Sequence, residues 1–210
     1  MTVLVAYGTT GGSTGEIAGW IAAELRAAGL PVDLMPAGEV ADVAEYRALV
    51  LGSAVYAMGW HSGVRQFARR FAGRFAGRPV WLFSSGPLDT SADDGSLPPG
   101  RHAVEAMREL PAREHVTFGG RITSEAHGWI GHLAGQLARE GHAGDFRNPE
   151  RVRAWARGIA AEISRAGRSG ASDEHRAVGV VDQLAADRAQ QGARDDAEAA
   201  IADDDQLRGV

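Results

Sequence analysis

The chain has 210 residues, of which 44% are hydrophobic, enough for one domain-sized core. It contains no cysteine, and all 22 of its basic residues are arginine, which excludes disulfides, thiolate metal sites and lysine-dependent chemistry. The formal net charge is −5. The chain begins with an apolar segment rather than a basic leader, and no apolar run is long enough to span a bilayer, so we expect a cytoplasmic protein.

The charge divides the chain into two parts. Residues 1–168 hold 18 arginines against 17 acidic residues, whereas residues 169–210 hold 4 against 10. The second part also lacks aromatic residues, so we expect a folded domain at 1–168 and an acidic, largely disordered tail at 169–210. Neither part shows the clustered basic face of a nucleic-acid-binding protein.

Apolar runs alternate with helical patterns along the first part. Strands are predicted at residues 2–7, 31–35, 48–55, 79–83 and 115–122, and helices from about 13, at 62–76, 101–110 and 126–139, and from about 148. This alternation predicts an α/β fold, a doubly wound five-stranded parallel sheet with helices on both faces. Such sheets bind ligands at the carboxyl ends of their strands, near the point where the strand order reverses.

The turn between the first strand and the first helix is rich in glycine and hydroxyl groups. It reads Thr9-Thr10-Gly11-Gly12-Ser13-Thr14. A helix N-terminus offers unpaired N–H groups and the positive end of the helix dipole, so this turn is suited to an anion. It lacks the Gly-Lys-Ser/Thr of a P-loop and the spacing of a dinucleotide fingerprint. A phosphate cradle of neutral donors remains, with a ligand-free helix cap as the alternative.

Two further polar loops follow the third and fourth predicted strands. The first of them contains the residues Tyr56, Ala57, Met58, Gly59 and Trp60; the other contains Ser84, Ser85 and Gly86. The alternative for the two aromatic residues is packing beneath the following helix. His61 is expected either to cap that helix or to lie near a ligand.

The turn at residues 9–14 resembles the flavodoxin superfamily, whose first loop reads T/S-x-T-G-x-T. It matches at Thr9, Gly12 and Thr14 and departs at Gly11, where the family usually has a hydroxyl. The resemblance implies a flavodoxin-like fold with FMN as cofactor. It places the phosphate on residues 9–14, the isoalloxazine ring against residues 56–60, and residues 84–86 on the other side of the ring.

A closer resemblance lies in the run from Gly52 to Ser62, which is similar to the menaquinone-dependent protoporphyrinogen IX dehydrogenase branch of this superfamily. It implies an FMN-dependent oxidoreductase with a porphyrinogen-like donor and a quinone acceptor. That branch has a basic segment after the fifth strand, but residues 126–141 contain only Arg139 and Glu140 as formal charges. Membrane contact is therefore expected to be at most peripheral, at the inner face.

Other functions remain to be weighed against this one. A flavodoxin-type electron carrier would bind redox proteins through an acidic face, and the nearly neutral domain counts against it. A phosphoacceptor receiver domain is excluded because it needs a lysine and acidic residues at the strand ends. A flavodoxin-like domain without FMN, acting in interactions alone, stays open. The sequence assigns no catalytic acid or base and no metal site.

Overall fold

The computed structural model describes residues 2–56, 59–87, 89–93, 95, 97–122 and 144–168, with only the backbone for Tyr56 and Ile122. The loop tip Ala57–Met58, the predicted helix at 126–139 and the predicted disordered tail at 169–210 lie outside these residues. The chain divides into two compact units, Met1–Ile163 and Ser164–Val210. The sheet and the loops that matter for function all belong to the first unit.

The first unit is built on a parallel sheet with the strand order β2-β1-β3-β5-β6. The strands are β1 Thr2–Gly8, β2 Val32–Pro36, β3 Tyr46–Tyr56, β4 Gly59–Trp60, β5 Val80–Ser85, β6 Glu114–Phe118, β7 Arg121–Ile122 and β8 Gly144–Asp145. The helices are α1 Ser13–Ala27, η1 Ala37–Glu39, α2 Ser62–Arg70, η2 Thr90–Ala92 and α3 Arg101–Glu109, followed by a helix at 149–168. The predicted doubly wound parallel sheet is confirmed.

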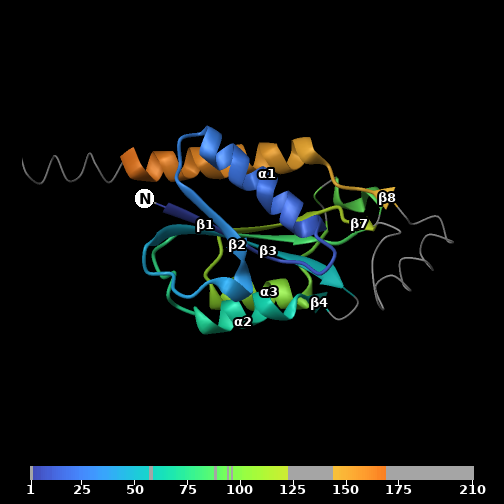
Figure 1. Cartoon of the computed structure of the whole chain (residues 1–210), viewed down its shortest axis with the longest axis horizontal. Coiled ribbons are helices and arrows are strands. Elements are labelled where there is room, and N and C mark those ends of the chain that lie inside the picture. The colour runs from blue at the N-terminus through green and yellow to red at the C-terminus, as the bar shows by residue number, and fades with distance from the viewer. Residues whose placement is uncertain are drawn as a thin grey trace, which may run out of the picture. The chain divides into compact units, whose positions relative to one another are not determined.

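Each face of the sheet is covered by helices, because the strand residues alternate between two apolar cores (Figure 1). Leu4, Leu49 and Leu82 face one core with α2 and α3. Val5 and Phe83 face the other with α1 and the helix that begins at 149. Burying a side chain of this size contributes roughly 1.5–3 kcal/mol, so the two apolar layers hold the sheet and its strand ends in place.

Two predicted elements end earlier than the sequence pattern indicates. The predicted helix 62–76 stops at Arg70, because turns follow in which Gly73 and Gly77 have φ values of 72° and 75°. The predicted strand 115–122 divides into β6 and β7. A Cβ at Gly119 would lie 1.9 Å from the Phe146 carbonyl oxygen, so the chain needs glycine where it leaves the sheet.

The carboxyl ends of three neighbouring strands form one edge of the sheet. The register pairs Gly8 of β1 with Ser53 of β3, and Ser53 with Ser84 of β5. Because the strands are parallel, the loops that follow them emerge side by side, as predicted. We call these loops the first loop (residues 9–14), the second loop (56–60) and the third loop (84–86).

Candidate functional site

The first loop is a tight turn with a glycine at the helix N-terminus. Gly12 is the N-cap residue of α1 with φ 82°, and no side chain caps the helix. The Gly12 N–H donates to Thr9 Oγ1 at 2.9 Å, which holds the turn closed. The first-turn N–H groups of α1 therefore keep their capacity to bind an anion.

Two hydroxyl groups directly follow this turn without partners. Ser13 Oγ and Thr14 Oγ1 are both buried, and neither has a hydrogen-bond partner among the described residues. An unsatisfied buried polar group costs about 1–3 kcal/mol. Both hydroxyls lie in the first turn of α1, where an anion would also meet the helix dipole. Because they make no hydrogen bond within the described part of the chain, they are candidate donors to a ligand.

The loop above these hydroxyls has room for that ligand. A Cβ added at Gly11 or at Gly12 would meet no atom within 4 Å. By contrast, a Cβ at Gly8 would lie 2.4 Å from Val64 Cγ2. The base of the loop is thus packed against α2, while its tip faces open space.

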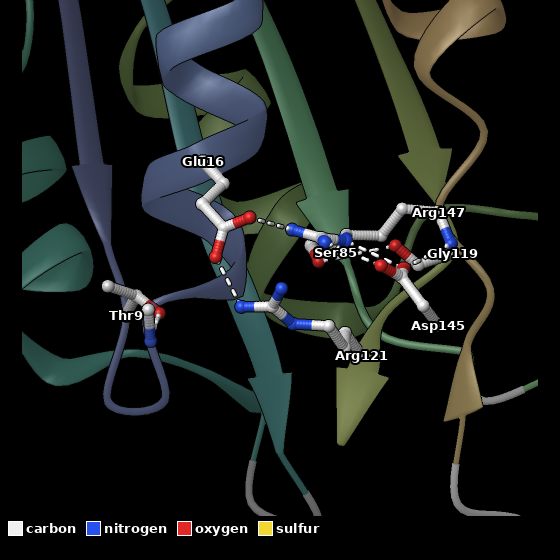
Figure 2. A network of polar contacts seen from close by, with 8 residues as sticks. Thr9, Glu16, Ser85, Gly119, Arg121, Asp145 and Arg147 are labelled. Atoms are coloured by element: carbon white, nitrogen blue, oxygen red, sulfur yellow. Dashed lines mark hydrogen bonds and ion pairs between the residues drawn. The ribbon is translucent and has the colours of Figure 1, made fainter. Parts of the chain in front are cut away.

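A charged cluster that the sequence did not predict lies one helical turn further along α1. Glu16 forms ion pairs with Arg121 and with Arg147, the latter at 2.8 Å, and Arg147 also pairs with Asp145 at 2.6 Å. Figure 2 shows the Glu16 carboxylate between the two guanidinium groups, with Thr9 on the neighbouring loop. The Arg147 side chain is only 4% exposed and its guanidinium also lies over the Trp20 ring.

The pKa values of this cluster follow from its contacts. Burial pushes the pKa of Glu16 upward, but hydrogen bonds and charges from Arg147 and Arg121 outweigh it and hold that pKa below its usual value. The Arg147 hydrogen bond likewise lowers the pKa of Asp145. Glu16 is therefore ionised but neutralised by two cations, so it does not oppose a phosphate bound at the first loop.

The second loop forms a hairpin between β3 and β4, with Val55 opposite Trp60 and Tyr56 opposite Gly59. Trp60 is buried in the core beside α2 and α3, and its Nε1–H donates to Ser84 Oγ at 2.8 Å. This position corresponds to the packing alternative for that aromatic residue. The side chains of Tyr56, Ala57 and Met58 lie outside the described part of the chain, so their predicted contact with a ring stays a prediction.

The polar groups of the third loop form hydrogen bonds inside the protein. Ser84 Oγ accepts from Trp60 Nε1 and lies 2.8 Å from His115 Nε2. Ser85 Oγ donates to the Gly119 carbonyl at 3.5 Å, and the Gly86 N–H donates to the Phe118 carbonyl at 3.2 Å. The predicted role of these three residues in holding a cofactor stays a prediction, but their hydroxyls and this N–H already have structural partners.

Val55 was not singled out by the sequence pattern, yet it lies between the second and third loops. Its side chain is 42% exposed, and among the described residues it is the only large hydrophobic side chain that is exposed. A Cβ at Gly86 would lie 2.8 Å from Val55 Cβ, so the two residues are neighbours across the strand ends. An exposed apolar side chain at the carboxyl edge is a suitable contact for a planar ring.

Three histidines near this edge are occupied by structural hydrogen bonds. His61 Nδ1 accepts from Gly63 N at 3.2 Å and so caps α2, which confirms one of its two expected roles. His102 Nδ1 accepts from Trp60 N, and His115 lies against Ser84. Burial lowers the pKa of His115 to about 4, so it is neutral at pH 7. We therefore assign none of the three as a general acid or base.

Comparison with known proteins agrees with this architecture. The family model described as Flavodoxin domain matches residues 4–147. No curated protein matches the sequence. None of the helices among the described residues has the length and apolarity needed to cross a membrane.

Several solved structures that resemble the chain are flavodoxins. A point mutant of flavodoxin from Pseudomonas aeruginosa is 18% identical, with 68% of this chain and 97% of that chain covered and a TM-score of 0.45. Oxidised flavodoxin 2 from Bacillus cereus is 22% identical, with 67% and 99% covered and a TM-score of 0.44. Rubredoxin oxygen:oxidoreductase from Desulfovibrio gigas is 17% identical, with 66% and 35% covered and a TM-score of 0.46. Because the matching family model spans well over half of its residues, the chain belongs to the flavodoxin domain family.

Proposed function

We propose that this protein binds FMN and uses it as a redox cofactor. The observation that carries the proposal is the pair of buried, unpartnered hydroxyls of Ser13 and Thr14 beneath an open glycine turn. Together with the N–H groups of the first loop they supply neutral donors to a phosphate. Members of this family generally bind FMN, which, when bound, accepts and returns electrons at its ring.

The ring of the cofactor would lie between the second and third loops. Val55 provides an apolar contact there, and the buried Trp60 supports the hairpin from beneath. In this arrangement Thr9, Thr10, Gly11 and Gly12 surround the phosphate, while Tyr56, Ala57, Met58 and Gly59 flank the ring. Ser84, Ser85 and Gly86 form the floor on the other side, with their hydroxyls holding neighbouring elements together.

For the reaction, we favour an oxidoreductase that takes electrons from a small donor, such as protoporphyrinogen IX, and passes them to a quinone. His61, His102 and His115 are engaged in structural hydrogen bonds, so the chain's own part is to orient the reactants and shape the ring's surroundings. A quinone acceptor fits a cytoplasmic protein whose membrane contact is at most peripheral.

A flavodoxin-type electron carrier is the second candidate. The structural hydrogen bonds of the three histidines also favour a carrier, because a carrier needs no acid or base from the protein. Against it, α2 directly follows the second loop and contains three arginines and no acidic residue. This is opposite in charge to the acidic face by which such carriers steer toward their partners.

The test is an FMN titration of the purified full chain. We expect the protein to be yellow, or to quench FMN fluorescence with a Kd at or below the micromolar range. The loaded protein is then mixed with protoporphyrinogen IX and a menaquinone analogue. Separately, after its flavin has been reduced with dithionite, it is mixed with an oxidised one-electron protein acceptor. Turnover with the first pair supports the oxidoreductase, and reduction of the protein acceptor alone supports the carrier. No FMN binding at micromolar concentrations overturns both.

A further inference from the structure

We propose that His102 is the positioning residue of the second loop, and that it fixes the backbone against which the cofactor ring would lie. The inference rests on the proposed FMN function. His102 is the second residue of α3 and lies 42 residues beyond the loop in sequence. No motif in the sequence connects the two.

The first observation is a hydrogen bond from the loop backbone to this side chain. The Trp60 N–H donates to His102 Nδ1 at 3.1 Å. A ring nitrogen that accepts a hydrogen bond carries no proton, so in neutral His102 the proton is on Nε2. The bond exists only while Nδ1 is an acceptor, so the conformation of the loop depends on which ring nitrogen of His102 carries the proton.

The second observation is that the imidazole packs directly on the loop backbone. Gly59 has φ 99°, and a Cβ there would lie 2.0 Å from His102 Nδ1. Glycine is therefore required twice, once for its backbone conformation and once for the close approach of the ring. His102 therefore contacts the hairpin at both residues of β4.

The third observation is that the other side-chain hydrogen bonds around the hairpin act on different groups. The indole of Trp60 is held by Ser84, and the N–H of His61 donates to Ser53 Oγ at 2.9 Å. The first bond anchors the side chain of Trp60, and the second anchors the backbone of His61. The acceptor of the Trp60 N–H comes from α3 rather than from the sheet. Gly59 and Trp60 also pair with β3, so losing that acceptor removes one of the constraints on the Gly59–Trp60 peptide.

The surroundings of His102 fit this role. Its side chain lines a cavity of about 10 Å³ between α2 and α3, together with Arg65, Glu105 and Glu109. This volume is about that of one water molecule. The cavity thus lies beside the imidazole, and two of its lining residues are carboxylates.

Two variants separate the hydrogen bond from simple packing. His102→Asn places an amide oxygen near the position of Nδ1 and keeps an acceptor, whereas His102→Leu keeps bulk but has none. In the cofactor-free protein we expect the Trp60 amide hydrogen to exchange at least tenfold faster in the Leu variant, with the Asn variant close to wild type. In the FMN-loaded protein we expect at least a tenfold weaker Kd in the Leu variant and its recovery in the Asn variant.

Equal behaviour of the Asn and Leu variants, or an unchanged Trp60 exchange rate in the Leu variant, would overturn the inference. So would a faster exchange rate with an unchanged Kd for FMN. If the Leu variant does not fold, His102→Ala takes its place. Failure of the wild-type protein to bind FMN would instead overturn the proposed function, and the exchange measurement would still decide whether His102 fixes the loop.

Discussion

The first and third loops have similar compositions, but their buried hydroxyl groups differ in whether they have hydrogen-bond partners. Both follow buried parallel strands at the same edge of the sheet, and both are rich in glycine and serine or threonine. In the first loop, the hydroxyls of Ser13 and Thr14 are buried without partners. In the third loop, the hydroxyls of Ser84 and Ser85 are buried with partners.

This difference shows which loop has donors left for a ligand. A hydroxyl whose bonds are satisfied inside the protein contributes to stability, and a ligand must break those bonds to use it. A hydroxyl without a partner gains a bond when the ligand arrives. The first loop is thus the candidate for phosphate binding, and the third loop is a structural support that presents its backbone.

The largest expected effect comes from Gly12→Asp in the first loop. The backbone there has φ 82°, which strains any L side chain, and a carboxylate would repel a phosphate. We expect FMN affinity to fall more than 100-fold, or about 3 kcal/mol. Gly29→Asp is the matched control, because Gly29 also has φ 82° but lies beyond the other end of α1. Similar losses of FMN affinity in both variants would contradict the assignment.

The second prediction concerns the anchor of the third loop. His115 has a pKa of about 4 in the folded protein and an ordinary value of 6.5 when unfolded. Between these values the unfolded chain binds more protons, so stability should fall as the pH drops from 6.5 to 4, by up to about 3 kcal/mol. Chemical denaturation across this range measures the fall. The His115→Gln variant should lose that part of the pH dependence, and an unchanged profile would show that His115 is not buried as described.

A third prediction compares one variant of the third loop with one variant of the first loop. Ser84→Ala leaves the indole N–H of Trp60 unpaired, so we expect it to lower the free energy of unfolding by about 1–3 kcal/mol. Thr14→Val removes a hydroxyl that has no partner, so the free protein should be as stable or about 1 kcal/mol more stable. FMN binding by the Thr14 variant should weaken roughly fivefold to tenfold. Destabilisation by both substitutions would remove the distinction between the loops.

The smallest effect is expected at Gly11, where the related loops usually carry a hydroxyl. A side chain there meets no atom within 4 Å, and its φ is not positive. Gly11→Ser should therefore fold without strain and add a donor, tightening FMN binding by about 0.5–1.5 kcal/mol. Gly11→Ala is the control for backbone effects alone. If the Ser and Ala variants bind FMN equally, the phosphate does not contact this position.

Much of the architecture could be predicted from the sequence, because the signals are local. The apolar runs, the glycine turn at Gly12 and the alternation of strands and helices each lie within a short stretch, and all three are confirmed. The unpredicted features depend on long-range contacts. Arg147 meets Glu16 across 131 residues, and His102 meets Trp60 across 42. No pattern of spacing shows which of 22 arginines will lie beside one carboxylate.

The sequence offered the interior position of Trp60 only as an alternative, and it did not predict that of Ser84. An aromatic residue and a serine in two loops give no sign that they hydrogen-bond to each other rather than to a ligand. The pairing of β4 with β3 and of β3 with β5 brings them within 2.8 Å. The sequence could therefore bring the three predicted loops to the same strand ends, but it could not show which of their polar groups have partners inside the protein.

The most direct test of the central claim compares FMN with riboflavin, which has the same ring but no phosphate. The Kd values of both for the purified protein are measured by flavin fluorescence quenching under the same conditions. If the phosphate lies in the first loop, FMN should bind at least 100-fold more tightly than riboflavin, and Gly12→Asp should abolish most of that difference. Equal affinities for the two flavins would contradict the account.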